Sequence, residues 1–94
     1  RLFSFKGGKT NLVEMTLPSD SPIIGHRIDE LDFPGDAVLV AIIRDGNAAP
    51  PASDGSLEGD DELLFVANPA HELELAHYLA PGVARERVTD DEDE

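Results

Sequence analysis

The stretch that most constrains the fold of this 94-residue chain is the apolar run Ala37-Val38-Leu39-Val40-Ala41-Ile42-Ile43. Seven aliphatic, largely β-branched residues are too few for a typical helix, so the run predicts a central strand covered on both faces. Asp45-Gly46 follows almost at once and is a strong signal for a tight hairpin. Because Pro50-Pro51 lacks backbone N–H donors, we expect the returning strand to be short and to lie at an edge.

Two further strands and one helix are indicated on either side of this hairpin. Asn11–Leu17 alternates between two faces and predicts a half-buried strand, whereas Glu62–Ala67 is almost wholly apolar. Asn68-Pro69 places a good cap before a proline and predicts a helix that runs to about Ala80. We expect the apolar face of that helix to comprise Leu73, Leu75, Ala76, Leu79 and Ala80.

The segment from Ser21 to Leu31 predicts another helix. Ser21 is a suitable N-cap and Pro22 suits the first helical position. Ile24, Ile28 and Leu31 recur at the spacing of one apolar helix face. On such a helix Ile23 would point away from the core, beside Arg27, so these two residues suggest a binding surface.

The resulting order is strand, helix, strand, short strand, strand, helix. This order predicts a small α+β domain in which a sheet of about four strands carries two helices. We expect residues 1–10 to form a lead-in or linker, residues 11–82 to form the domain, and the acidic residues 83–94 to form a largely disordered tail.

The charge is strongly acidic, with seven Lys and Arg against twenty Asp and Glu and a net charge of -13. Such a field disfavours nucleic acid and anionic membrane surfaces as partners. No cysteine is present, which excludes disulfides and thiolate chemistry and suits the cytoplasm. No apolar run is long enough to insert into a membrane, and no signal-peptide pattern opens the chain.

Nothing in the sequence indicates an enzyme or a metal centre. No serine lies in a nucleophile elbow, and no dinucleotide fingerprint is present. His71 and His77 are six residues apart on the predicted helix, so they point to different faces and do not share a metal. Residues 54–61 lack the alternating acidic spacing of a calcium loop and are interpreted as a solvated turn, with weak calcium binding as the alternative.

Taken together, the motifs resemble a known family over about Asn11 to Leu79. The resemblance is carried by a strand ending in Leu17-Pro18, by Ser21-Pro22-Ile23-Ile24-Gly25, and by Val40 to Gly46. Gly59-Asp60, the strand after it and the Asn68-Pro69 helix continue the pattern. In order and spacing these pieces are similar to the C-terminal regulatory domain of TrkA-type potassium-transport proteins, also called the TrkA-C or RCK C-terminal domain.

The resemblance implies a non-catalytic, cytoplasmic regulatory domain that follows a Rossmann domain and acts peripherally on a membrane potassium transporter. Such domains typically form homodimers, and in some members the dimer interface binds cyclic di-AMP. The matching surface would comprise Ile23, Ile24 and Arg27, with Arg44 and Pro50 from the nearby hairpin.

Two features leave alternatives open. The hairpin segment Ala48–Ala52 offers few side-chain donors for a nucleotide, and the acidic field opposes a dianion. One alternative is therefore a pure dimerisation module without a ligand. Another is the same domain on a different transporter, such as an antiporter or an anion carrier, since a fold does not fix a function.

Overall fold

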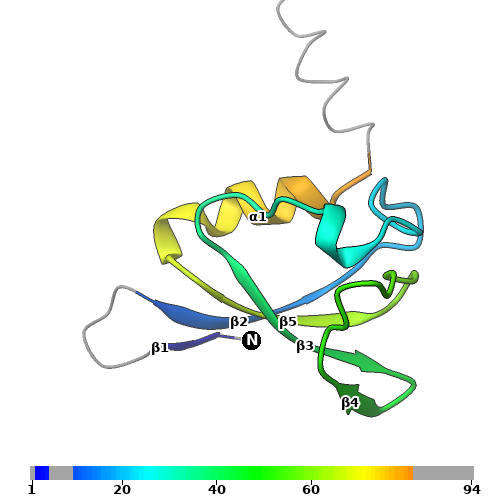
Figure 1. The fold of residues 1–94 in the computed structure, drawn as a ribbon. Coiled ribbons are helices and arrows are strands. Elements are labelled where there is room, and N and C mark those ends of the chain that lie inside the picture. The colour runs from blue at the N-terminus through cyan, green and yellow to red at the C-terminus, as the bar shows by residue number, and fades with distance from the viewer. Residues whose placement is uncertain (1, 5–9, 82–94) are drawn as a thin grey trace, which may run out of the picture.

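Five antiparallel strands form a single sheet in the computed structural model, which describes residues 2–4 and 10–81 (Figure 1). Their order across the sheet is β1-β2-β5-β3-β4, so the last strand in the sequence lies at the centre. The strands are β1 (Leu2–Ser4), β2 (Asn11–Thr16), β3 (Val38–Arg44), β4 (Asn47–Ala49) and β5 (Glu62–Ala67).

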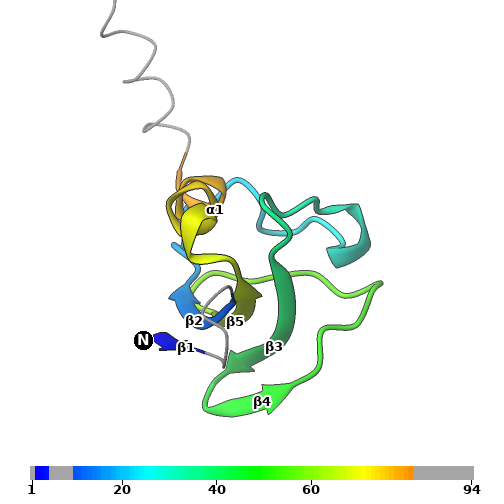
Figure 2. The ribbon, with the colours of Figure 1, turned by 90° about the vertical axis from the view of Figure 1, so that its left-hand side faces the viewer.

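One α-helix, α1 (Glu72–Leu79), crosses one face of this sheet (Figures 1 and 2). Two short 3-10 helices, η1 (Ile28–Glu30) and η2 (Pro69–His71), accompany it. The core lies between α1 and the sheet, and its fully buried apolar side chains are Leu17, Leu57, Leu63, Phe65 and Leu75. The predicted α+β class is confirmed, although the described residues contain one α-helix where the sequence predicts two.

The C-terminal helix begins as its capping residues predict. The Asn68 side chain accepts a hydrogen bond from the backbone N–H of Ala70 at 2.9 Å, and Pro69 occupies the first helical position. The first turn is η2, and α1 follows directly. Leu75 and Leu79 face the core, but the predicted apolar face is too broad, because Leu73 is 69% exposed.

The helix predicted from Pro22 to about Leu31 is absent. Residues 22–25 form turns, and the one helical stretch is η1. Gly25 has φ +87°, a left-handed conformation that interrupts a right-handed helix. Ser21 does cap locally, since its hydroxyl accepts a hydrogen bond from the backbone N–H of Ile23 at 3.3 Å, but it caps a turn.

The apolar run after Ala37 is a strand, but it is not covered on both faces as predicted. Val38 is 55% exposed and Val40 is 40% exposed on the uncovered side of β3. On the covered side Leu39 pairs with Phe65 and Ile42 with Leu63, and the register shifts between Leu39 and Ala41. The central position belongs to β5, whose alternate residues are fully buried beneath α1.

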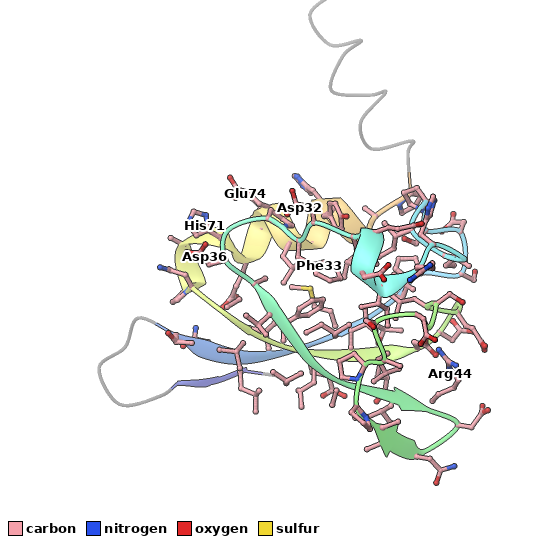
Figure 3. All side chains as sticks on the ribbon, viewed as in Figure 1. Asp32, Phe33, Asp36, Arg44, His71 and Glu74 are labelled. Atoms are coloured by element: carbon pink, nitrogen blue, oxygen red, sulfur yellow. The ribbon has the colours of Figure 1, made fainter. Side chains whose placement is uncertain are left out.

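The segment 31–37 lies against α1 and closes one side of the core (Figures 1 and 3). The ring of Phe33 makes edge-to-face contacts with Phe65 and Tyr78, at centroid distances of 5.1 and 5.4 Å. The Tyr78 hydroxyl accepts a hydrogen bond from the backbone N–H of Asp32 at 3.1 Å. This segment therefore joins the sheet to the helix through one aromatic cluster and one hydrogen bond.

The structure describes part of the predicted lead-in but none of the predicted tail. The proposed lead-in contains β1, which pairs with β2 through Leu2 and Val13. The proposed tail, residues 83–94, lies outside the described residues. Within the part of the chain that is described, no helix is long and apolar enough to cross a membrane.

Candidate functional site

A cleft of about 430 Å³ opens between the β3–β4 hairpin and the loop that follows it. Asp45 and Gly46 both have positive φ and form the two-residue turn of the hairpin, as the sequence predicts. The hairpin contributes one wall of the cleft and residues 50–58 contribute the other. The residues that line the cleft include Ile28, Ile42, Arg44, Asn47, Pro50 and Glu58.

The loop wall is held by backbone pairing with residues 25–29. Gly25 donates to the Leu57 carbonyl at 3.2 Å and Ile28 to the Gly55 carbonyl at 2.8 Å. Asp29 donates to the Ser53 carbonyl at 3.0 Å, so the two segments run as an irregular antiparallel pair. This pairing uses the donors that a helix over 22–31 would have needed.

Arg44, at the end of β3, is the cationic centre of the site (Figure 3). Its Nε donates to Asp61 Oδ1 at 2.8 Å and its Nη2 donates to Asp61 Oδ2 at 2.7 Å. Asp61 is 2% exposed and also accepts a hydrogen bond from the backbone N–H of Glu58 at 2.9 Å. This forked pair links β3 to the end of the loop, because guanidinium and carboxylate match in geometry.

Two more contacts complete the surroundings of Arg44. Its Nη2 also donates to the Ser56 carbonyl at 3.2 Å, and its Nη1 lies 3.2 Å from Glu58 Oε2. The hydrogen bond from Arg44 lowers the pKa of Asp61, against the opposing effect of burial. The same hydrogen bond raises the pKa of Arg44. Both groups are therefore fully charged at neutral pH.

The structure brings together two of the five residues predicted for the interface. Arg44 and Pro50 line the cleft. Ile24 is half-buried and Arg27 is exposed, with Arg27 Nη2 2.6 Å from Asp29 Oδ2. Neither lines the cleft, although they lie next to or within the segment that pairs with the loop wall. Ile23 is 6% exposed within the core, so the outward orientation predicted for it is wrong.

Sequence reasoning missed Asp61 and Glu58. The sequence predicts a solvated turn over residues 54–61, yet Asp61 is buried and Leu57 belongs to the core. The available signal is faint: Asp61 directly precedes β5, and since Glu62 pairs with Ile43, Asp61 comes opposite the strand end that carries Arg44. Across residues 2–4 and 10–81, no group of three metal-ligating side chains is close enough to hold an ion.

A family model and two relatives of known name all relate this chain to TrkA proteins. The model of the TrkA-C domain family matches residues 12–80. The Trk system potassium uptake protein TrkA of Mycobacterium tuberculosis is 46% identical over 83 residues, which is 88% of this chain and 38% of that protein. A TrkA homolog from Archaeoglobus fulgidus is 30% identical over 86 residues, covering 92% of this chain and 20% of the relative.

A solved chain described as "Structure of RCK domain with cda" has a similar fold, with a TM-score of 0.66 and 25% sequence identity. The match covers 73% of this chain and 97% of the solved one. This chain spans only a minor part of the TrkA proteins that it matches. Because the family model covers most of the sequence and the described fold agrees, the chain belongs to the TrkA-C domain family.

Proposed function

We propose that this chain is a non-catalytic regulatory domain of a potassium-uptake system. It acts in the cytoplasm as a homodimer that is peripheral to a membrane transporter. The observation that carries the proposal is the 46% identity to a Trk potassium uptake protein over 83 residues. The family match over 12–80 includes both walls of the cleft, so the candidate site belongs to the shared domain.

We further propose that the cleft is where a small ligand, cyclic di-AMP being the first candidate, acts on the domain. A solved RCK domain with a similar fold is described as being "with cda". Here the lining of the cleft combines the apolar side chains of Ile28 and Ile42 with polar ones that include Arg44, Asn47 and Glu58. Small-molecule sites join apolar surface for contact area with polar groups that fix the orientation of the ligand.

The transport role is tested in the cells that encode the protein. Deleting the codons for residues 12–80 should change the rate of rubidium uptake, rubidium serving as a tracer for potassium. Uptake of an unrelated anion in the same cells is the control for the alternative transporters. Unchanged rubidium uptake combined with altered anion uptake would reject potassium as the regulated ion.

Ligand binding is tested by calorimetric titration of the protein with cyclic di-AMP. Heat of binding that falls in an Asn47→Ala variant would support the cleft, because Asn47 lines it. The control is Asp20→Ala, which changes an exposed residue outside the cleft. Asn68→Ala is unsuitable as a control, because Asn68 caps a helix. Absence of heat at high ligand concentration would favour the pure dimerisation module.

Homodimer formation through the segment 23–27 needs its own test. An Ile23→Asp substitution would place a charge in the core, so Arg27→Glu, at an exposed position, is the better choice. If Arg27 lies at the interface, sedimentation velocity should detect a shift toward monomer in this variant. If the variant sediments like the unaltered protein, Arg27 does not lie at the interface.

A further inference from the structure

The donors of Arg44 are almost fully used within the protein. A guanidinium carries five N–H donors. Nε donates to Asp61, and Nη2 donates to Asp61 and to the Ser56 carbonyl. Nη1 directs one donor toward Glu58 at 3.2 Å, which leaves one N–H of Nη1 without a partner among the described contacts. Because the donors of Nε and Nη2 are all used, an anion that enters the cleft can reach Arg44 only at Nη1, where the Glu58 carboxylate already lies.

The two carboxylates on Arg44 differ in how easily they can be displaced. The Asp61 side chain is 1% exposed, holds the guanidinium by two hydrogen bonds, and also accepts from the backbone of Glu58. The Glu58 side chain is 63% exposed and makes a single contact with Arg44. Exposed single-contact ion pairs contribute little to stability, so Glu58 can turn into solvent at small cost.

We propose that the Glu58 carboxylate competes with incoming anions for Arg44 Nη1, and that it thereby determines the charge of the ligand that the cleft accepts. An anionic group gains access to Nη1 by displacing the Glu58 carboxylate, while Asp61 keeps the guanidinium in place. Glu58 also repels a second anion in the same cleft, because like charges at short range disfavour each other. Glu58 thus weakens anion binding and leaves the binding of neutral ligands nearly unchanged.

This inference deepens the proposed ligand site and rests on the cleft being accessible to small molecules. Its test compares Glu58→Gln with Asp60→Asn. Both variants remove one negative charge from the same loop, but Asp60 is exposed and has no side-chain contact with Arg44. Asparagine tolerates the positive φ of +71° at position 60, and glutamine keeps the backbone N–H that donates to Asp61. Melting curves of both variants are recorded first, to establish that each one folds.

The probe is inorganic pyrophosphate, titrated calorimetrically at low ionic strength, with Arg44 followed through the nitrogen-15 signals of its side chain. We expect Glu58→Gln to bind pyrophosphate about fivefold more tightly than the unaltered protein, the size of an exposed ion pair. Asp60→Asn should change the affinity by less than about twofold, because Asp60 does not line the cleft and makes no ion pair with Arg44. The Arg44 Nη signals should move on binding.

The remaining outcomes overturn the inference or separate it from the proposed function. Equal gains in the two variants would attribute the effect to net charge, and an absence of pyrophosphate binding in every variant would also reject Glu58 as a competitor. A parallel titration with cyclic di-AMP tests the ligand itself. If pyrophosphate behaves as expected and cyclic di-AMP does not bind, the competitor role stands and cyclic di-AMP is rejected.

Discussion

Asp61 is a buried carboxylate whose charge is balanced by the guanidinium of Arg44. Replacing it by asparagine removes that charge and leaves Arg44 with the exposed Glu58 as its partner. We expect Asp61→Asn to lower the free energy of unfolding by about 2 kcal/mol, less than for a fully buried pair, since Arg44 retains contact with water. Urea denaturation measures this loss, and Asp60→Asn, an exposed neighbour, should leave the midpoint nearly unchanged.

The same carboxylate predicts a pH dependence. Its pKa is lowered in the folded protein, chiefly by the hydrogen bond from Arg44. Folding therefore gains stability from Asp61 above the pKa of the unfolded chain, about pH 4. That gain is lost as the pH falls through the lower folded pKa. The stability difference between unaltered protein and Asp61→Asn should be largest near neutral pH and shrink below about pH 4. A constant difference across this range would contradict the assignment.

Ile23 offers a test of the core. Its side chain packs among buried residues, whereas the neighbouring Ile24 is only half-buried. Ile23→Ala should cost about 3 kcal/mol of unfolding free energy, the usual loss for a buried isoleucine, and Ile24→Ala should cost clearly less. Equal losses in denaturant titrations would mean that Ile23 is no more buried than its neighbour.

Sequence patterns predict which residues of the strands are buried, but they do not predict the burial of Ile23 and Asp61. Val13, Leu63 and Phe65 are buried, as strand alternation or apolar content predicts. The placements of Ile23 and Asp61 depend on partners elsewhere in the sequence: Ile23 joins a core built from distant strands, and Asp61 meets Arg44 17 residues away. Periodicity describes neighbours along the chain and carries no information about such partners.

At the scale of elements, the same distinction explains which predictions were right. β2, β3 and β5 follow from apolar or alternating patterns, and the hairpin with β4 follows from the Asp45-Gly46 turn, because these signals are local. β1 is the exception, since it lies in residues expected to be a lead-in. The segment 22–31 carries an equally good local helix signal. Its backbone donors at Gly25, Ile28 and Asp29 pair instead with the loop 53–57, a competition between distant segments that local propensity does not include.

The segment 31–37 predicts a difference between two glycines. Gly35 and Gly46 both have positive φ, but a Cβ at Gly35 would collide with His71, whereas a Cβ at Gly46 meets open space. Gly46→Ala should cost about 1 kcal/mol through backbone strain alone. Gly35→Ala should cost more, because the segment must also move away from η2. Thermal unfolding measures both, and equal shifts would show that the contact with His71 does not constrain the segment.

For the molecule as a whole, the net charge of -13 sets the response to salt. Folding brings the carboxylates closer together, so their mutual repulsion opposes the folded state. Added sodium chloride screens this repulsion, and we expect the melting temperature to rise by about 4 °C or more on going to physiological ionic strength. Potassium chloride at the same concentration should give an equal rise, and a melting temperature that rises in neither salt would contradict charge screening.

The central position of β5 has a consequence for how the chain is made. β5 separates β2 from β3, so neither of these strands has its inner neighbour until Ala67 has been synthesised. During synthesis the hairpin of β3 and β4 can close on its own, but the sheet and its buried core must wait. Pairings between distant parts of a chain form slowly. On the ribosome β2 and β3 therefore stay without their central neighbour until β5 has been made, and chaperones have access to their apolar residues during that interval.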